Sequence, residues 1–520
     1  MTGGPTFVHD FLAQSATRRP DHTAIIAGDR RITFAALDRD SDVLAATLQD
    51  MGVARGDRVA IFLDNSIELV TAVFATLKAG AVFVNVNPTT KADKLHYLLD
   101  DCRVKVMVAQ SSLGPVVAEV APQAASVTGI IWSHEAPAKA PKGETLPSIL
   151  AGTNRKPAPT GLIDIDLCTI IYTSGSTGNP KGVMLTHRNM TNTAWAISTY
   201  LRNTPDDVVL AVLPLSFDYG MYQVITGARV GFTVVLEKSF AFPFETLKRM
   251  IEHKVTGLPG VPTIFARMLQ LEKFNGRDFP TLRYMSNTAA ALPPAHIKRM
   301  RELFPDTLIF SMYGLTECTR VCYLEPERLE DKISSVGKAM PNSEIYVVDE
   351  TGQRVAPGVV GELVIRGANV MRGYWGKPEE TAKRLKPGPI EGEMVLHSGD
   401  QFWMDSEGFV YFVGRTDEIF KCRGEKVSPK EIEHVLYAIP EVVEAAVVGV
   451  EDAIDGMAVK AIVVPREGAE ITEAAVRKHC RQHLESHLVP KHVEIRASIP
   501  KTATGKISKK ELAAASAGAG

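Results

Sequence analysis

A stretch of small hydroxylated residues and glycines has the composition of a polyphosphate-binding loop. It spans Thr169–Gly182 and reads TIIYTSGSTGNPKG. The β-branched and aromatic residues at positions 170–172 predict a buried strand. Backbone N–H groups and hydroxyls after that strand could surround an anion, and Lys181 adds a positive charge. The residues expected to bind phosphate are Thr173, Ser174, Gly175, Ser176, Thr177, Gly178 and Lys181.

Two other interpretations fit this stretch less well. A flexible Ser/Gly linker would not follow a buried strand and end in Pro-Lys-Gly. The P-loop of NTPases needs a second glycine before its lysine, and Pro180 stands at that place. The sequence therefore predicts a phosphate-binding loop of another kind.

Three further segments carry acids or lysines. They are Tyr313–Glu317 (YGLTE), Ser398–Asp400 (SGD) and Pro500–Lys506 (PKTATGK). Taken alone, Glu317 and the lysines of the last segment would be typical of solvated surface residues. Mg²⁺ prefers hard oxygen ligands and binds through a carboxylate plus substrate phosphates, which suits an acid such as Glu317. A lysine held between two anions offsets their repulsion and stabilises charge that builds on phosphoryl oxygens.

Six motifs, in their order along the chain, resemble those of the adenylate-forming superfamily. This superfamily includes acyl-CoA synthetases, peptide-synthetase adenylation domains and firefly-type luciferases. The resemblance runs over nearly the whole chain and implies that the protein activates a carboxylic acid with ATP and Mg²⁺. The motifs are Thr169–Gly182, Leu213–Gly220, Asn287–Ala291, Tyr313–Glu317, Ser398–Asp400 with Arg415, and Pro500–Lys506.

The resemblance also implies residue roles around the nucleotide. Glu317 would bind Mg²⁺, and Asp400 would accept hydrogen bonds from the ribose hydroxyls. Lys506 matches the catalytic lysine, with Lys501 as the neighbouring candidate. The remaining expected nucleotide contacts are Thr288, Ala289, Ala290, Tyr313, Gly314, Thr316, Arg415 and Lys421.

Two roles concern the second half of the reaction. In acyl-CoA synthetases the counterparts of Arg423 and Gly424 touch coenzyme A. The superfamily bends between its two half-reactions at the position of 415–417, so we predict a hinge there that includes Asp417.

The acid-binding pocket departs from the pattern of many acyl- and aryl-CoA synthetases, which have a histidine where this chain has Phe217. Phe217 followed by Asp218 is similar to peptide-synthetase adenylation domains, whose Asp pairs with the amino group of an amino acid. A buried Asp without a partner would be costly, so either a substrate ammonium or Arg320 satisfies Asp218. If Arg320 does, the pocket suits a neutral acyl or aryl acid. The expected lining is Phe217, Asp218, Tyr219, Tyr222, Pro259, Ser286, Thr288, Met312, Arg320 and Val321.

We expect two half-reactions. The acid and MgATP first give an acyl-adenylate and pyrophosphate; a thiol then attacks the adenylate and releases AMP. The sequence KVSPKEIE at 426–433 resembles acyl-CoA synthetases, which favours coenzyme A over the phosphopantetheine of a separate carrier protein. A luciferase-type oxidase and a catalytically silent nucleotide-binding protein are the alternatives. A silent protein would be expected to have lost Glu317 or Lys506.

The elements that must position these residues alternate along the chain. Predicted strands at 58–63, 81–85 and 104–108 flank predicted helices at 67–78 and 91–100, and a similar run follows at 207–312. Such alternation predicts an α/β fold, with a large N-terminal domain of doubly wound sheets. Short strands after residue 333 predict a small antiparallel β subdomain. We expect domains at 1–414 and 418–520, the second a mobile small α+β domain that carries the catalytic lysine.

Three ranges carry more specific expectations. A strand is predicted at 230–237, an exposed connection at 135–161 and a helix at 472–487.

Composition limits the partners. The chain has 520 residues, 45% hydrophobic and 23% charged, and its 58 basic against 60 acidic residues give a net charge of −2. This balance does not suggest binding to nucleic acid. We find no secretory signal, and Lys78 interrupts the best apolar run, Leu69–Val84, so we expect no transmembrane segment and a cytoplasmic enzyme.

Overall fold

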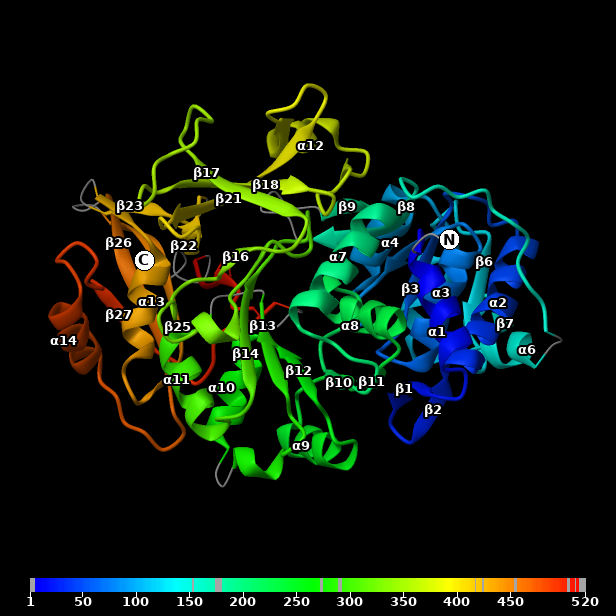
Figure 1. The fold of residues 1–520 in the computed structure, drawn as a ribbon, viewed down its shortest axis with the longest axis horizontal. Helices are drawn as coiled ribbons and strands as arrows, with labels where there is room; N and C mark the ends of the chain where they lie inside the picture. Colours follow the sequence, from blue (N-terminus) through cyan, green and yellow to red (C-terminus); the bar gives the residue numbers. More distant parts are fainter. Residues whose placement is uncertain are drawn as a thin grey trace.

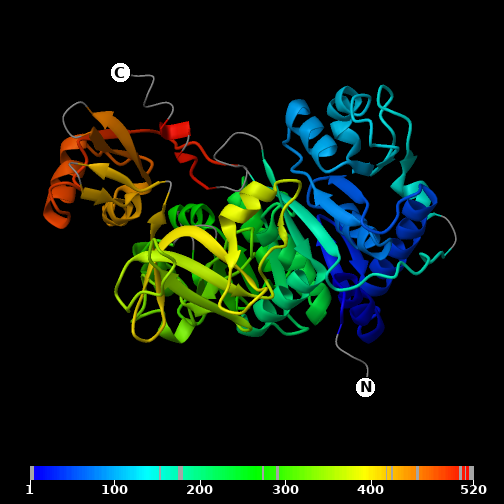
Figure 2. The same cartoon turned by 90° about the horizontal axis from the view of Figure 1, so that it is seen from above.

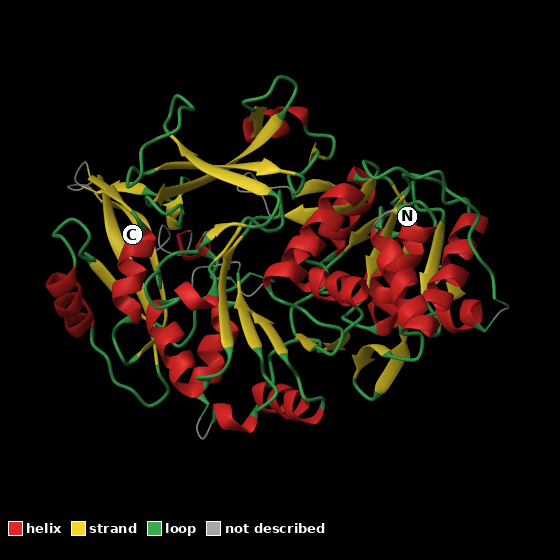
Figure 3. Cartoon of the chain, in the orientation of Figure 1, coloured by secondary structure: helices red, strands yellow, loops and turns green. Residues whose placement is uncertain are grey.

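The computed structural model shows a large α/β part, an antiparallel sheet against it and a C-terminal unit at one side (Figure 1). Figure 3 shows helices flanking the strands of the large part. The structure describes residues 5–151, 154–173, 180–271, 275–288, 292–416, 418–422, 425–452, 456–502, 506–509 and 511–513.

A mostly parallel sheet, here sheet A, forms one half of the large part. Its strands from β14 to β1 are parallel, whereas β2, β15 and β16 pair antiparallel at the edges. In spatial order they are β16 (Lys338–Ala339), β15 (Cys322–Tyr323), β14 (Leu308–Tyr313), β13 (Tyr284–Asn287), β12 (Gly257–Gly260), β10 (Val208–Ala211), β11 (Thr233–Leu236), β1 (Thr23–Ala27) and β2 (Arg30–Thr33).

Sheet B forms the other half, and both of its faces are buried. In β3, Val59 and Ile61 belong to a core shared with sheet A, whereas Ala60 and Phe62 belong to a second core on the opposite face. In spatial order its strands are β19 (Gly373–Tyr374), β9 (Lys181–Thr186), β8 (Leu167–Thr173), β4 (Val82–Asn85), β3 (Arg58–Phe62), β5 (Val104–Ala109), β6 (Gly129–Trp132) and β7 (Glu144–Thr145).

Helices join the sheets into one body. Five pack on one another and share the common core: α1 (Val8–Arg18), α2 (Phe34–Asp50), α3 (Ile67–Lys78), α7 (His187–Tyr200) and α8 (Asp218–Val230). Two cover the second core of sheet B: α4 (Ala92–Asp101) and α5 (Gly114–Val120). The others in the large part are α6 (Leu146–Leu150), α9 (Pro243–Glu252), α10 (Pro262–Gln270), α11 (Pro294–Leu303) and α12 (Pro378–Arg384). Short 3₁₀ turns lie at Ser111–Leu113, Gly276–Asp278 and Pro326–Arg328.

An antiparallel sheet and a C-terminal α+β unit complete the chain. The antiparallel sheet contains β17 (Ser343–Val348), β18 (Gly361–Gly367), β20 (Leu385–Pro387), β21 (Met394–Met404) and β22 (Val410–Arg415). The C-terminal unit contains β23 (Phe420–Cys422), β24 (Glu425–Val427), α13 (Pro429–Tyr437), β25 (Val442–Asp452), β26 (Gly456–Pro465), α14 (Glu473–His483) and β27 (His492–Ile495). It has apolar cores of its own.

The predicted fold class is confirmed, with corrections at particular segments. The strand predicted at 230–237 begins only at Thr233, because α8 continues to Val230 and ends at Gly231 with a left-handed φ of 95°. The region 135–161 is not simply exposed, since Leu146 and Ile149 of α6 are buried. The helix predicted at 472–487 ends at His483. The domain limits at 414 and 418 stay predictions, and Asp417 lies outside the described residues.

None of the described helices combines the length and the apolar character that a bilayer span requires.

An aromatic contact links the large part to the C-terminal unit. The ring of His296 on α11 meets the ring of Tyr437 on α13 edge to face, with 5.6 Å between centroids. Burial lowers the pKa of His296 from 6.5 to about 4. In this arrangement of the two parts, here called closed, the His296 imidazole is therefore neutral at neutral pH.

Acidification should open this arrangement. Below about pH 6.5 a released His296 takes a proton, whereas the buried ring stays neutral down to about pH 4. The closed form therefore loses stability as the pH falls through this window, up to about tenfold in population per pH unit. A fluorescence distance measurement between the large part and the C-terminal unit checks this. His296→Gln should flatten the response between pH 7.5 and 5; an unchanged response would assign it to other groups.

Candidate functional site

The candidate site lies where parallel strands of both sheets end. Thr173 ends β8, Asn287 ends β13 and Tyr313 ends β14. The carboxyl edge of a parallel sheet is where such folds bind ligands, because the connections from neighbouring strands meet there. Thr288 follows β13 directly, and Gly314 and Thr316 follow β14, so these predicted nucleotide residues share this edge.

Tyr313 and Asp400 are joined by a hydrogen bond. The Tyr313 hydroxyl donates to Asp400 Oδ2 at 2.6 Å, and burial together with this carboxylate raises the pKa of the phenol. The ring packs edge to face against Phe402, with 4.9 Å between centroids. Asp400 on β21 stands opposite Arg415 on β22 in the antiparallel register. Three residues predicted to contact the nucleotide therefore lie together.

Tyr374 connects the predicted metal ligand to the predicted phosphate lysine. Its hydroxyl donates to Glu317 Oε1 at 2.6 Å, and Lys181 Nζ lies 5.5 Å from the centre of its ring. Strand β19, which carries Tyr374, pairs antiparallel with β9, which begins at Lys181. Lys181 Nζ also donates to Glu380 Oε2 at 2.5 Å, and this bond, together with that from Lys383, lowers the pKa of Glu380 to about 2.

Lys506 belongs to the C-terminal segment and lies near the candidate site on the large part. Figure 2 shows the red C-terminal segment leaving the orange unit and extending over the large part. The Lys506 side chain is exposed to solvent, yet enough protein surrounds it for desolvation to lower its pKa. Among the charges that act on it, Asp218 has the largest effect, followed by Arg415, Asp400 and Glu317. Residues of both the predicted nucleotide site and the predicted acid site therefore act electrostatically on this ammonium.

Lys501, the neighbouring candidate, is held elsewhere. Its ammonium forms an ion pair with Glu444 of β25, within the C-terminal unit. An antiparallel backbone bridge joins Lys501 to Ile507, the residue that follows Lys506. The two lysines therefore differ: Lys501 forms an ion pair within the C-terminal unit, whereas residues of the large part act on Lys506.

The predicted acid pocket is densely filled. Arg320 Nη1 donates to Asp218 Oδ2 at 3.3 Å, so an internal partner for Asp218 is present. The Arg320 guanidinium lies over the ring of Tyr219 at 4.5 Å, and the Tyr219 hydroxyl donates to Ser286 O at 2.7 Å. The other predicted pocket residues in this region are also buried: Tyr222, Pro259, Thr288, Met312 and Val321.

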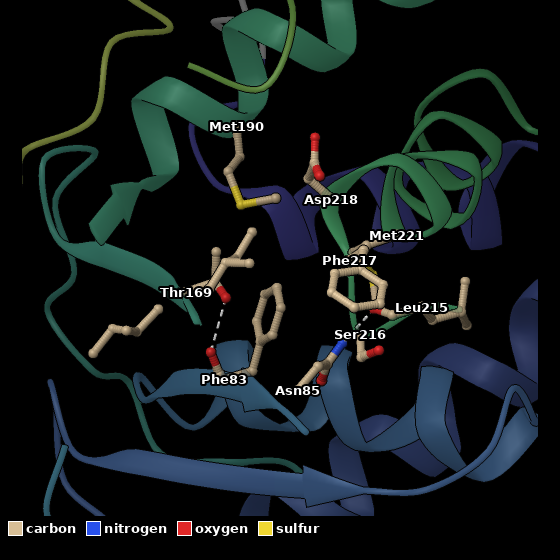
Figure 4. Close-up of a pocket in the computed structure, with 11 residues that line it drawn as sticks. Phe83, Asn85, Thr169, Met190, Leu215, Ser216, Phe217, Asp218 and Met221 are labelled. Atoms are coloured by element: carbon tan, nitrogen blue, oxygen red, sulfur yellow. Dashed lines mark hydrogen bonds between the residues drawn. The ribbon is translucent and has the colours of Figure 1, made fainter. Parts of the chain in front are cut away.

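A narrow cavity lies beside Phe217, between α7, α8 and sheet B (Figure 4). Figure 4 shows the rings of Phe83 and Phe217 near each other in the middle of the view. Its lining includes Thr169–Ile171 of β8, the strand that leads into the phosphate loop. The complete lining is Phe83, Asn85, Thr169, Ile170, Ile171, Met190, Leu215, Ser216, Phe217, Asp218 and Met221. The start of α8 therefore lies beside β8, the strand that precedes the predicted phosphate-binding loop.

Several predicted residues are not placed by the structure. Ser174, Gly175, Ser176, Thr177, Gly178, Ala289, Ala290, Asp417, Arg423 and Gly424 lie outside the described residues, and for Lys421 only the backbone position in β23 is described. Their roles stay predictions.

Sequence reasoning missed Tyr374, Glu380 and the cavity residues Phe83 and Asn85. Tyr374 stands in the run Gly-Tyr-Trp-Gly at 373–376, and aromatic residues between glycines are a signal that could have marked it. Phe83 and Asn85 carry no such signal, because β4 reads as an ordinary buried strand.

The charge pattern fits a nucleotide with a metal ion. Glu317 is a hard oxygen donor held by the Tyr374 hydroxyl, which suits Mg²⁺ bound jointly by protein and phosphates. Lys181 and Lys506 are cations placed to meet anionic ligands. The described residues are therefore compatible with ATP, Mg²⁺ and a carboxylate.

Comparison with known proteins gives the same picture over nearly the full length. The family model described as AMP-binding enzyme matches residues 12–375, and that of the AMP-binding enzyme C-terminal domain matches residues 431–506. A long-chain-fatty-acid–CoA ligase of Bacillus subtilis (strain 168) is 32% identical, over 97% of this chain and 94% of the relative. Tyrocidine synthase 3 of Brevibacillus parabrevis is 31% identical over 97% of this chain, which covers 8% of that protein.

A solved structure shares the arrangement. The anthranilate CoA ligase AuaEII in complex with anthranoyl-AMP superposes with a TM-score of 0.91 at 26% identity, and covers 99% of this chain and 98% of its own.

Replacing Glu380 should strengthen ATP binding. In Glu380→Gln the phosphates no longer compete with a carboxylate for Lys181, so the Kd for ATP should fall about two- to fivefold, the range of a partly exposed ion pair. Titration calorimetry measures this. Glu379→Gln is the matched control, because it removes the same charge from the neighbouring position. An equal fall of the Kd in both variants would assign the effect to the loss of one negative charge near the site. An unchanged Kd in both variants would contradict a phosphate-binding role for Lys181.

Proposed function

This chain belongs to the AMP-binding enzyme family, and we propose that it is an AMP-forming ligase that joins a carboxylic acid to the thiol of coenzyme A. The observation that carries the proposal is that Lys506, from the C-terminal unit, lies near enough to Asp218, Asp400 and Glu317 of the large part for these carboxylates to act on its pKa. An acid and a nucleotide triphosphate are both anions, and a cation between them is what their condensation requires.

In the first half-reaction a carboxylate oxygen of the acid attacks the α-phosphorus of ATP, and pyrophosphate leaves. Lys506 would offset the charge on the attacking oxygen and the phosphoryl oxygens, and Lys181 would hold the outer phosphates. Asp400 and Tyr313 would orient the ribose and base. Glu317 would hold Mg²⁺, which neutralises phosphate charge when bound. The product is an acyl-adenylate.

In the second half-reaction a thiol sulfur attacks the carbonyl of the acyl-adenylate, and AMP leaves. We propose that the C-terminal unit rotates about 415–417 for this step, removing Lys506 and bringing the loop with Arg423 and Gly424 to the cleft. The acyl group passes directly from AMP to sulfur, so no covalent bond to the enzyme is needed. The contact between His296 and Tyr437 belongs to the first arrangement.

A carrier-protein acceptor is the second candidate. It is favoured by Asp218 at the pocket entrance and by similarity to tyrocidine synthase 3, over a small part of that protein. Phosphopantetheine of a separate carrier protein presents the same thiol as coenzyme A, so the first half-reaction would be unchanged.

Pyrophosphate release with a panel of acids tests the proposal. Fatty, aryl and amino acids are supplied with MgATP, with and without coenzyme A, and the products are identified by mass spectrometry. We expect release with at least one acid and an acyl-CoA product when coenzyme A is present. Release without thioester formation would favour a carrier protein or an oxidase. Binding of ATP with no release for any acid would contradict the proposed function.

Removal of the Lys506 ammonium separates the half-reactions. Lys506→Ala should slow adenylate formation by about 10²–10³, the effect of losing one preorganised electrostatic group. Thioester formation from a supplied acyl-adenylate should be nearly unchanged. Lys501→Ala is the control, because Lys501 is paired with Glu444 away from the cleft, and its adenylation rate should stay near that of the wild type. Equal losses in both half-reactions would contradict the role of Lys506.

A further inference from the structure

Asp218 and Arg320 form an ion pair at the start of the acid pocket that is poorly satisfied. Nη1 of Arg320 reaches Asp218 Oδ2 at 3.3 Å and also donates to Thr319 O at 2.7 Å. Arg320 Nε is buried and has no hydrogen-bond partner among the described residues. The Arg320 side chain is 3% exposed and that of Asp218 is 17% exposed. A buried guanidinium with an unused donor calls for an acceptor.

An ion pair that supports the fold looks different in this same chain. Arg283 binds Asp207 through two hydrogen bonds, Nη2 to Oδ2 at 2.7 Å and Nε to Oδ1 at 3.2 Å. Asp207 accepts further bonds from the Thr256 hydroxyl and the Thr204 N–H, both at 2.8 Å. The guanidinium and the carboxylate of that pair therefore both have several hydrogen-bond partners, in the bidentate geometry that Arg and carboxylates prefer. Arg320 and Asp218, by contrast, share one longer hydrogen bond of 3.3 Å and lack this bidentate geometry.

The position of Arg320 is nevertheless fixed. Its guanidinium lies over the Tyr219 ring at 4.5 Å, and the Tyr219 hydroxyl is held by Ser286 through O at 2.7 Å and Oγ at 2.9 Å. Stacking on an aromatic ring orients a guanidinium without using its donors. Arg320 also interacts with the Tyr200 side chain, so it is a preorganised cation whose unused donor is Nε.

The charges of the pocket restrict the acids that would match it. Asp218 lines the cavity beside Phe217, and among the charges that act on Lys506 it has the largest effect. An acid with only an ammonium group would draw Asp218 away and leave Arg320 buried without its counterion. An acid with a second carboxylate but no ammonium group would bind Arg320 and leave Asp218 without a counterion. A neutral acid keeps the pair but leaves Arg320 Nε unsatisfied.

We propose that the acid is an amino dicarboxylic acid, whose ammonium binds Asp218 and whose non-reacting carboxylate binds Arg320. The reacting carboxylate then lies toward Lys506, and each charge of the acid meets an opposite charge of the protein. Arg320 is the residue that determines this specificity. This inference rests on the proposed function, because it names the acid that the same site activates.

Matched acids test this specificity in the wild-type enzyme. Pyrophosphate release is measured with butanoate, succinate, 2-aminobutanoate and aspartate, and with pentanoate, glutarate, 2-aminopentanoate and glutamate, using both enantiomers of each amino acid. Benzoate and hexadecanoate are included as neutral acids. We expect kcat/KM for an amino dicarboxylate to exceed that of its partners of equal length by about 10²–10³, the size of leaving a buried charge unpaired.

Variants separate recognition from support of the fold. Arg320→Gln should shift the preference toward amino acids with one carboxylate, and Asp218→Asn toward dicarboxylates without an ammonium. A purely structural role would lower activity with all acids alike. Arg283→Gln is the matched control, because it breaks the structural pair: it should lower the Tm and leave the order of preference unchanged.

The outcomes distinguish this inference from the proposed function. Preference of the wild type for benzoate, a fatty acid, a plain amino acid or a plain dicarboxylate would overturn the inference and leave the ligase activity intact. Equal losses for all acids in both Arg320→Gln and Asp218→Asn would overturn it too. ATP binding without pyrophosphate release for any acid would contradict the proposed function itself.

Discussion

The site depends on one electrostatic balance, in which several carboxylates are gathered around a lysine ammonium. Asp218, Asp400 and Glu317 all act on Lys506 and stabilise its charged form, while desolvation and Arg415 oppose this effect. Carboxylates near one another repel, and the charge of the lysine offsets this repulsion. Because the pKa of Lys506 is lowered overall, desolvation outweighs this attraction, so docking of the C-terminal unit disfavours the charged form of the lysine.

The scaffold makes this balance possible by bringing distant segments to one edge. Sheet A presents the ends of β13 and β14, and sheet B contributes the end of β8 together with the β9–β19 pair. The shared helical core fixes the two sheets relative to each other. The C-terminal unit has separate cores and meets α11 through His296 and Tyr437, so this boundary can give way without loss of either core.

Much of this arrangement could be predicted from local sequence. The alternation of apolar runs predicted the parallel sheets and the helix at 67–78, and this helix begins at Ile67 because the Ser66 hydroxyl accepts a hydrogen bond from the Leu69 N–H. Helix α8 was missed because Gly220 and Gly227 lie within it and its apolar periodicity is interrupted. Its first turn was interpreted only as a pocket motif.

Contacts between distant residues could not be predicted in detail. The sequence identified Asp218 and Arg320 as possible partners, yet the single 3.3 Å bond and the unused Nε depend on the packing of Tyr219. Likewise, the bond from Tyr374 to Glu317 depends on the pairing of β19 with β9, between segments almost two hundred residues apart. Motifs identify such residues only where a resemblance already assigns them roles.

The position of Tyr374 in the chain has a consequence for biosynthesis. Strand β9, with Lys181, is made long before β19, which pairs with it and orients Glu317 through Tyr374. During translation β9 therefore leaves the ribosome before β19, and this edge of β9 stays uncovered until residue 374 emerges. An uncovered strand edge is a place where nascent chains associate wrongly, so protection of this edge of β9 depends on the later synthesis of β19.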